Sequence, residues 1–499
     1  MTAKSVDQLV AGLKQLGNDN FKQQKFQEAI YNYSQALEAS DSSEFMEALL
    51  TNRAAAAMKL ELYGTVLQDC TRALDLNPQS YKAFYRRALA HTSLFHFKEA
   101  ASDFKSLVAI KPNDAKARKL YDQALKEHKK RLFEAAIRIQ PKSFFALYDL
   151  SISGAGPVEV PELELTPTDP ITPEYIRRLI AFCKQDKEIP HRNILQILKR
   201  GFEILNAEPN LVEFSISKAE LQAAGDNRVL TVFGDVHGQF FDLVHLIETV
   251  GMPSDTHRMV FMGDYVDRGA WGVPCFVLIV ALKVMCPNSV TMLRGNHETK
   301  DMNSMFGLNA EIVQRYTAKL SEALDDIFNR LPLAAVADIE GVDRTMFVHG
   351  GLPDPKTRLP EINLLHRNQQ PPSSGIFTDL LWSDPTLAPG RTPSPRGTSF
   401  QFGPDVADEF MTLNNLTQVV RAHQVVDDGY KVEFPKGPKV ATVFSAARYC
   451  DFNTNKGAVG FYTGRSTELE FMQYEAQPHP DRPLPMLNNQ LSALFNPRA

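Results

Sequence analysis

The chain has no apolar run close to the ~20 residues that a membrane-spanning helix requires. Residues 1–25 also lack the apolar core of a secretory signal peptide. Cysteine is scarce, with 5 residues among 499, and the five are far apart, which argues against a disulfide framework and favours reduced thiols. We therefore expect no membrane span and a location in the cytoplasm and nucleus.

The chain also lacks a strong charge of either sign. A net charge of −5 argues against a nucleic-acid binder held mainly by attraction to phosphates. The hydrophobic content of 43% and the charged content of 23% are ordinary for a globular protein. At ~100–200 residues per domain, the length of 499 residues predicts two to four domains.

A helical pattern repeats in residues 1–140. Similar segments start at Leu16, Ala55 and Ala88, and Pro78 and Pro112 close successive units 34 residues apart. A generic helical bundle is the alternative, but it gives no reason for proline to return after 34 residues. The period predicts three tetratricopeptide repeats and a capping helix, because such helix pairs bury their apolar faces by stacking on one another.

The rest of the chain changes character twice. Residues 141–175 contain six prolines and few periodic apolar positions, which predicts a linker. From 176 to 475, strand-like runs alternate with helical segments, which predicts an α/β domain with buried parallel strands. Residues 476–499 form a tail that starts proline-rich and ends amphipathic. The expected architecture is an all-α repeat solenoid followed by an α/β domain.

Five strand-like runs of the α/β region end in a carboxylate, an amide or an imidazole. Ligands of open α/β sheets bind outside the carboxyl ends of the strands, so these groups can converge. Nitrogen and carboxylate ligands suit manganese, iron or zinc, and two ions sharing a carboxylate are a standard device for phosphoryl transfer. A single histidine is usually structural, but this recurrence favours a metal site. Its candidates are Asp235, His237, Asp264, Asn296, His349 and His423.

Neighbouring residues suggest how a phosphate would be handled. Arg268 and Arg294 lie next to candidate ligands, and guanidinium groups suit phosphoryl oxygens. His297 follows Asn296 directly and is free to act as an acid, with Asp267 as the partner that keeps it protonated.

The motifs "GDVHG", "GDYVDRG", "LRGNHE" and "HGG", with "RAHQ" downstream, closely resemble the phosphoprotein phosphatase family of metal-dependent serine/threonine phosphatases. The resemblance covers residues 176–475. It implies a metallophosphoesterase domain with a central β-sandwich. It also implies that phosphoserine and phosphothreonine in proteins are hydrolysed by hydroxide at a site with two divalent ions, with manganese expected in vitro.

The resemblance also implies a role for each motif residue. Asp235 and His237 would bind the first ion, with Asp264 bridging, and Asn296, His349 and His423 would complete the second. His297 and Asp267 would be the proton donor pair, and Arg268, Asn296, Arg396 and Tyr449 would hold the phosphate. Arg294 does not belong to the family's phosphate clamp. The family's Ser-Ala-Pro-Asn-Tyr-Cys is replaced here by "SAARYC", so Ala447 and Arg448 predict an altered substrate preference or an altered toxin sensitivity.

The repeats carry a candidate peptide site. Residues four apart share a helix face, so cations and amides can converge on the concave surface and bind a carboxylate-rich peptide end. Solvated surface charges are the alternative. The candidates resemble the carboxylate clamp that similar domains use for the C-terminal tail of heat-shock protein 90-type chaperones, and they are Lys14, Asn18, Asn52, Lys82 and Arg86.

In the family that these motifs resemble, the repeats lie over the catalytic channel and the tail helps to hold them there. Binding of a chaperone peptide or a fatty-acid activator would then release activity. Two other functions remain open at this point. One is a metallophosphoesterase acting on nucleotides or small phosphoesters, and the other is a non-catalytic co-chaperone adaptor, which the complete set of metal ligands disfavours.

Overall fold

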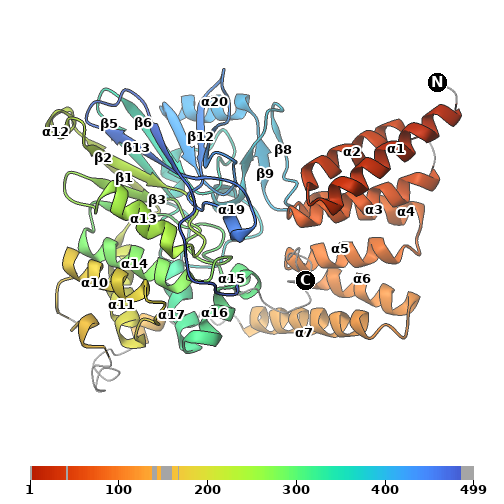
Figure 1. Ribbon diagram of the computed structural model, residues 1–499, viewed down its shortest axis with the longest axis horizontal. Helices are drawn as coiled ribbons and strands as arrows, with labels where there is room; N and C mark the ends of the chain where they lie inside the picture. Colours follow the sequence, from red (N-terminus) through yellow and green to blue (C-terminus); the bar gives the residue numbers. More distant parts are fainter. Residues whose placement is uncertain (1–2, 41–42, 138–142, 148–159, 167, 485–499) are drawn as a thin grey trace. The chain divides into compact units, whose positions relative to one another are not determined.

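The computed structural model describes residues 3–40, 43–137, 143–147, 160–166 and 168–484, and its contacts define two compact units. The N-terminal unit is a series of antiparallel helix pairs, each packed on the next (Figure 1). Small buried residues such as Ala29, Ala73 and Ala100 let the helices approach closely. The helices are α1 (Ala3–Lys22), α2 (Phe26–Ala39), α3 (Ser43–Lys59), α4 (Tyr63–Leu76), α5 (Tyr81–Ser93), α6 (Phe97–Ile110) and α7 (Ala115–Ile137).

The turn inside each helix pair is the same in all three repeats. Gln24, Glu61 and Phe95 have φ angles of 63°, 58° and 59°, a left-handed conformation that reverses the chain after the first helix. In each repeat the next residue donates its N–H to the carbonyl five positions back, at 2.9, 2.9 and 2.8 Å. The predicted repeat architecture is confirmed.

The C-terminal unit contains two large sheets. The five-stranded sheet has the order β14-β13-β2-β3-β4, and the six-stranded sheet has the order β1-β5-β6-β10-β12-β11. Strands β2, β3 and β4 are parallel to one another, as are β6, β10 and β12. The strands are β1 (Leu211–Ile216), β2 (Arg228–Phe233), β3 (Arg258–Phe261), β4 (Val290–Met292), β5 (Ala334–Ile339), β6 (Asp343–Val348), β10 (Gln418–Arg421), β11 (Tyr430–Val432), β12 (Lys439–Val443), β13 (Gly457–Thr463) and β14 (Glu470–Tyr474).

The two sheets pack face to face. One buried cluster joins Leu230 and Val260 of the five-stranded sheet to Phe347, Val420 and Val443 of the six-stranded sheet. The predicted β-sandwich is therefore confirmed. A third, small sheet consists of β7 (Asp384–Pro385), β8 (Arg391–Pro393) and β9 (Phe400–Phe402).

Helices cover the outer faces of the sandwich. The first group packs on the five-stranded sheet, and residues 272–283 of its central helix α14 are all buried. The group comprises α10 (Pro173–Cys183), α11 (His191–Ala207), α13 (Phe240–Val250), α14 (Gly272–Met285), α16 (Leu308–Arg315) and α17 (Lys319–Phe328). The second group packs on the six-stranded sheet and comprises α18 (Leu359–Ile362), α19 (Ile376–Trp382) and α20 (Pro404–Leu413). Shorter helices are α8 (Phe144–Leu147), η1 (Pro161–Leu163), α12 (Lys218–Ala224), α15 (Lys300–Phe306) and η2 (Tyr449–Asp451).

The described parts of the segment expected to be a linker pack on the C-terminal unit. Phe145 and Leu163 are buried in the same core as α11 and α14. Ser143 Oγ and the Phe145 N–H both donate to Asp326, at 2.7 and 3.1 Å. Residues 143–147, 160–166 and 168–175 are thus an integral part of this unit, and less of the segment is left as a linker than the prolines suggest.

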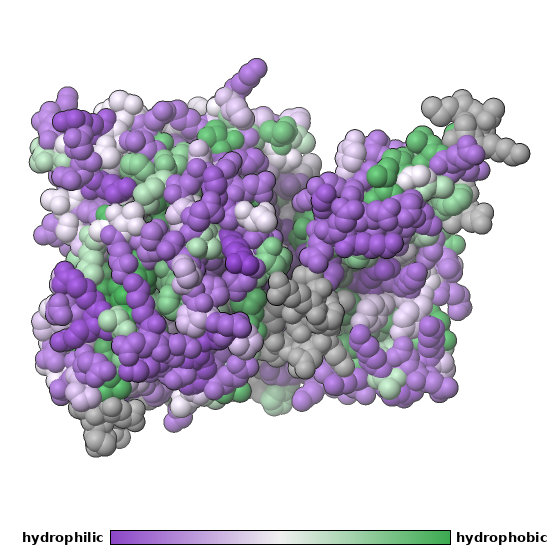
Figure 2. Space-filling view, viewed as in Figure 1, coloured by the Kyte–Doolittle hydropathy of each residue, from purple (hydrophilic) through white to green (hydrophobic). Residues whose placement is uncertain are grey.

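The visible surfaces of both units are mainly hydrophilic, with apolar residues in small groups (Figure 2). Within the described ranges, none of the helices has the length and apolar character required to cross a bilayer. The part of the predicted tail beyond residue 484 lies outside the described residues.

Candidate metal and phosphate site

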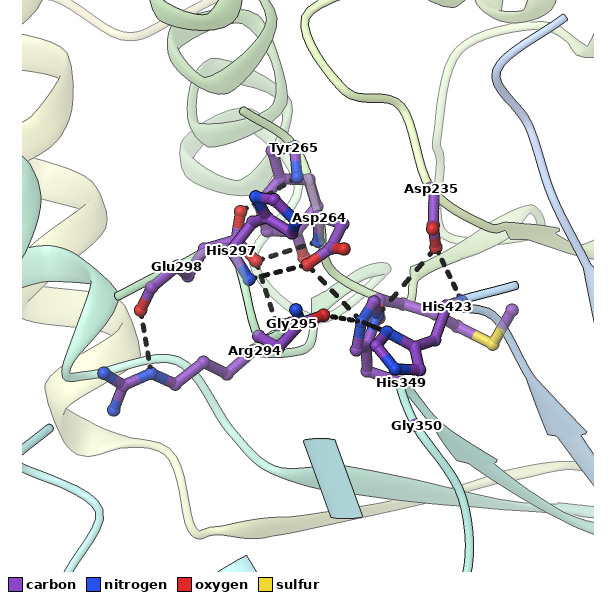
Figure 3. Close-up of polar contacts among 12 residues, drawn as sticks. Asp235, Asp264, Tyr265, Arg294, Gly295, His297, Glu298, His349, Gly350 and His423 are labelled. Atoms are coloured by element: carbon purple, nitrogen blue, oxygen red, sulfur yellow. Dashed lines mark hydrogen bonds and ion pairs between the residues drawn. The ribbon is translucent and has the colours of Figure 1, made fainter. Parts of the chain in front are cut away.

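The loops that follow five strands lie at one end of the sandwich. Their polar side chains, including those of Asp235, Asp264, His349 and His423, lie close together (Figure 3). The loops after β2, β3 and β4 come from the five-stranded sheet, and those after β6 and β10 come from the six-stranded sheet. The backbone after β4 passes close to the Asp264 carboxylate, since a Cβ on Gly295 would lie 2.2 Å from Asp264 Oδ1. Glycine is therefore required there for the loop to pass beside the carboxylate.

The first group of candidate ligands is Asp235, His237 and Asp264. His237 Nε2 lies 3.4 Å from Asp264 Oδ2 and 3.7 Å from Asp235 Oδ2. All three side chains are buried. Asp235 Oδ2 has no hydrogen-bond partner among the described residues. A buried carboxylate oxygen without a hydrogen-bond donor is suited to bind a cation.

The second group shares Asp264 with the first. His349 Nε2 lies 2.8 Å from Asn296 Oδ1, 3.4 Å from Asp264 Oδ1 and 3.2 Å from His423 Nδ1. The N–H of His423 donates to Asp235 Oδ1 at 2.9 Å, which joins the two groups. The structure thus brings all six predicted metal ligands together.

The backbone fixes which ring nitrogen each histidine presents. His237 Nδ1 donates to the Val266 carbonyl at 3.0 Å, and His349 Nδ1 donates to the Met262 carbonyl at 2.9 Å. In the neutral imidazole the remaining Nε2 is then an acceptor. For His349 this nitrogen faces two acceptor oxygens, from Asn296 and Asp264. Several lone pairs that face one another without a proton are the environment that a divalent cation satisfies.

Electrostatics agree with this interpretation. Burial lowers the pKa of His237 and of His349, which keeps both rings in the neutral form that binds metals. Burial, together with the nearby Asp264 carboxylate, raises the pKa of Asp235 to about 7. Bringing two carboxylates together in the interior is unfavourable without positive charge, so the donor set fits divalent metal ions.

His297 and Asp267 form the predicted pair. His297 Nδ1 lies 2.8 Å from Asp267 Oδ2, and both side chains are buried. Asp267 also accepts from Asn303 Nδ2 at 3.0 Å and from the Leu308 N–H at 2.8 Å. Burial raises the pKa of Asp267 to about 6. The pair lies beside the metal ligands, since ligand atoms of His297, His237 and Asp264 lie within 4.8 Å of one another.

Two of the predicted phosphate-binding side chains also border the cluster. The Arg268 guanidinium lies over the Phe306 ring, 4.0 Å from its centroid. The Tyr449 ring centroid lies 5.1 Å from that of His237. Arg396 is half-buried in the loop between β8 and β9, and its phosphate contact stays a prediction.

Arg294 has a different role from the one suggested by its position in the sequence. It is fully buried, and Nε donates to the Glu298 carbonyl at 3.1 Å. Its Nη1 donates to the carbonyls of Arg367 and Gln369, and its Nη2 donates to Asn329 Oδ1. The side chain extends away from the cluster (Figure 3). Arg294 therefore ties loops together, and the interpretation of it as a phosphate ligand was wrong.

Two residues that support the site were not predicted. Glu298 accepts the N–H groups of Asp264, Tyr265 and Gly295 at 2.8, 2.9 and 2.9 Å. It therefore fixes the loop that carries Asp264. Asn303 holds Asp267 and also donates to the His297 carbonyl at 2.7 Å. Glu298 ends the quoted motif "LRGNHE", which was a usable signal, whereas nothing in the sequence marks Asn303.

The repeat unit brings most of the predicted clamp together. Asn52 Nδ2 donates to Asn18 Oδ1 at 3.1 Å, and the Tyr33 hydroxyl donates to the same oxygen at 2.8 Å. Arg86 lies close enough to affect the pKa of the Tyr33 hydroxyl, and its Nη1 is buried with no partner among the described residues. The remaining two members differ in exposure, since Lys14 is half-buried near Phe45 and Lys82 is exposed.

Two family models match the chain. The calcineurin-like phosphoesterase model matches residues 229–427, from β2 to the loop after β10. The model described as the PPP5 TPR repeat region matches residues 121–213, from α7 to the start of β1. Together with the sandwich and its buried ligand cluster, these matches define the C-terminal unit as a metallophosphoesterase.

Full-length relatives narrow the class. The serine/threonine-protein phosphatase T of Aspergillus oryzae is 36% identical over 99% of this chain and 100% of that protein. The human serine/threonine-protein phosphatase 5 is 36% identical over 96% of this chain and 93% of that protein. A solved Saccharomyces cerevisiae protein serine/threonine phosphatase with similarity to human phosphatase PP5 is 33% identical, with a TM-score of 0.57, over 62% of this chain and 98% of that chain. The chain belongs to the family of serine/threonine-protein phosphatases 5 and T.

Proposed function

We propose that this protein hydrolyses phosphoserine and phosphothreonine esters in proteins. The observation that carries the proposal is the convergence of six donor side chains, from five strand ends, in one buried cluster. The family matches support the same substrate class.

Two divalent cations would be held by the cluster, with Asp264 between them, since it belongs to both candidate ligand groups. Manganese, iron and zinc suit its nitrogen and oxygen donors, and manganese is the ion that we expect to support activity in vitro. When bound, the cations supply Lewis acidity for the phosphoryl oxygens and generate the nucleophile from water.

The chain's own residues then handle the leaving group and the phosphate. His297 Nε2 would donate a proton to the departing serine or threonine oxygen, while Asp267 holds the Nδ1 proton at 2.8 Å. General-acid help of this kind is worth ~10²–10⁴ in rate. Arg268, Asn296, Arg396 and Tyr449 would bind the phosphate oxygens and orient the ester.

The test is hydrolysis by purified protein loaded with manganese. We expect release of phosphate from phosphoserine peptides, much slower release from nucleoside triphosphates, and loss of activity on treatment with a chelator. A preference for nucleotides would overturn the proposed substrate class. The proposed hydrolysis does not depend on peptide binding by the repeats, so a protein that hydrolyses phosphopeptides but binds no chaperone peptide would not contradict it.

We further propose that the repeat unit docks the acidic C-terminal peptide of a heat-shock protein 90-type chaperone. The support is a set of amide and guanidinium groups around Asn18, including the buried Arg86 Nη1, which a peptide carboxylate would satisfy. Asn18 Nδ2 makes no hydrogen bond within the described part of the chain and is available to the peptide.

We also propose that the repeats and the tail 476–499 inhibit the catalytic unit, and that a peptide or a fatty acid relieves the inhibition. The division of the chain into two compact units supports such an equilibrium. Removal of the repeats should raise the rate on a small phosphoester, and equal rates would refute inhibition. Free cysteines support the proposed cytoplasmic and nuclear location.

A further inference from the structure

Residues 477–484, here called the C-terminal strap, lie along the C-terminal unit close to the candidate site. The Gln477 N–H donates to Asp242 Oδ1 at 2.7 Å. The Arg482 guanidinium lies 4.8 Å from the Trp271 ring centroid, donates to the Ala270 carbonyl at 3.1 Å and pairs with Asp186. An irregular segment with so many side-chain contacts is held in a defined position.

The strap borders a strained loop. Between Ala447 and Asp451, three residues have left-handed backbone, with φ angles of 47° at Arg448, 57° at Cys450 and 61° at Asp451. Side chains with a Cβ rarely adopt this conformation, and it persists only where the surroundings over-determine it. The loop carries Tyr449, whose ring lies beside His237.

The strap holds both ends of this loop. At the far end, His479 Nε2 lies 3.0 Å from Asp451 Oδ1. At the near end, Gln239 Nε2 donates to the Ala447 carbonyl at 2.7 Å and to Asp242 Oδ2 at 2.6 Å. Asp242 also accepts the Gln477 N–H, so it connects the strap, through Gln239, to the Ala447 carbonyl. Asn455 supports the loop from its inner side, since its Oδ1 accepts the Tyr449 N–H.

Both ring nitrogens of His479 face a hydrogen-bond acceptor. Its Nε2 faces the Asp451 carboxylate, and its Nδ1 lies 2.9 Å from the Pro480 carbonyl. Two acceptors select the imidazolium form, in which both nitrogens carry protons. The ring also packs on Trp271 and Phe241, with centroids 5.2 and 6.3 Å away, which fixes its direction.

We propose that His479 is a positioning residue for the phosphatase reaction, holding Asp451 so that Tyr449 stays over the metal-binding cluster. The inference rests on the proposed function, because Tyr449 matters only if a phosphate binds there. It assigns the strap a role in catalysis that is separate from any role of the tail in inhibition.

The experiment compares full-length protein with His479→Ala and Asp451→Asn, using p-nitrophenyl phosphate and a phosphopeptide. We expect each variant to lower kcat/KM about 10-fold, in line with the sensitivity of rates to small misplacements. The double variant should fall no further than either single variant, because both break the same contact. Asp481→Asn is the control, since Asp481 is an exposed strap carboxylate, and its kcat/KM should stay within about twofold of wild type.

A Tyr449→Ala background separates positioning from general stability. There, His479→Ala should change kcat/KM by less than about twofold, whereas a structural defect would lower it again. The inference is overturned if both single variants stay within about twofold of an active wild type, or if the loss persists without Tyr449. If His479→Ala lowers thermal stability, the kcat/KM of the isosteric variant Asp451→Asn decides whether the inference holds. An inactive wild type would instead refute the proposed function.

Discussion

Arg53 donates from Nε and Nη2 to the two carboxylate oxygens of Asp69, at 2.8 and 2.7 Å. Arg87 makes the same fork to Asp103, at 2.8 Å for both bonds. The two pairs are 34 residues apart, which is the repeat period, and both aspartates are buried. The second and third repeats therefore contain the same largely buried ion pair, which joins the two helices of each repeat.

Asp69→Ala should destabilise the repeat unit by about 3 kcal/mol, because it leaves the largely buried Arg53 without its counter-charge. Lys22→Ala is the matched control: it removes the exposed pair with Asp19, where the lysine side chain is 75% exposed, and should cost less than about 1 kcal/mol. Urea unfolding of both variants measures the difference. Equal losses would show that the repeated pair adds nothing beyond a surface contact.

Asp264→Asn should reduce the bound metal below two ions per chain, because Asp264 belongs to both candidate ligand groups. Activity should fall by more than about 100-fold, since even groups behind metal ligands are worth 10–100-fold. Metal analysis and kcat on a phosphopeptide measure both effects. Asp338→Asn, at an exposed carboxylate of β5, should keep two ions, and a full metal content in Asp264→Asn would contradict the shared-ligand assignment.

The metal ligands could be predicted because ligands of such sheets bind at the carboxyl ends of the strands, and the position of these ends depends only on chain topology. Asp235 and His423 are 188 residues apart, but each follows a strand whose carboxyl end points to the same edge of the sandwich. Adjacency in sequence was a poorer guide. Arg294 and Asn296 are two residues apart, yet one side chain joins distant loops and the other joins the cluster.

Contacts of irregular segments could not be predicted. The prolines of residues 141–175 suggested a linker without packing, but Pro161 and Pro173 each begin a helix and Leu163 is fully buried. The strap contacts of His479 and Arg482 likewise follow no periodic pattern. Such segments bury a few side chains individually, so neither helical nor strand periodicity reports them.

Lys82→Glu should abolish binding of an acidic chaperone-type C-terminal peptide, because it replaces an attractive charge with a repulsive one on the exposed end of the clamp. Isothermal titration calorimetry measures the affinity. Lys98→Glu makes the same charge change at an exposed position of α6, outside the clamp, and should leave the affinity within about threefold. Unchanged affinity in Lys82→Glu would exclude the clamp.

Arg448→Asn should change KM more than kcat. Arg448 is exposed and left-handed, with φ 47°, and asparagine tolerates this conformation better than arginine does. The substitution removes a charge from the loop that carries Tyr449 without touching a metal ligand, so it should alter which phosphopeptides bind. Steady-state kinetics on several phosphopeptides test this, with Arg465→Asn as a control for lost charge on a distant turn. An unchanged KM for every peptide would refute the expectation.

The contact between His479 and Asp451 should contribute to the free energy of unfolding at low pH and lose this contribution as pH rises. Burial opposes the charge of the ring, but the Pro480 carbonyl and the Asp451 carboxylate outweigh it and raise the pKa of His479. Asp242 adds negative charge, while Arg482 lies nearby on the strap and contacts the same Trp271 ring. A raised folded pKa contributes stability that is fully present below the ordinary histidine pKa of ~6.5 and is lost as pH rises through the folded value.

The melting temperature of His479→Gln should therefore differ most from wild type near about pH 6, and the difference should shrink toward about pH 9. Thermal unfolding at a series of pH values measures it, with Asp481→Asn as the variant that should show no such trend. A difference that stays constant or grows with pH would mean that His479 acts through ring packing on Trp271 and Phe241 rather than through its charge.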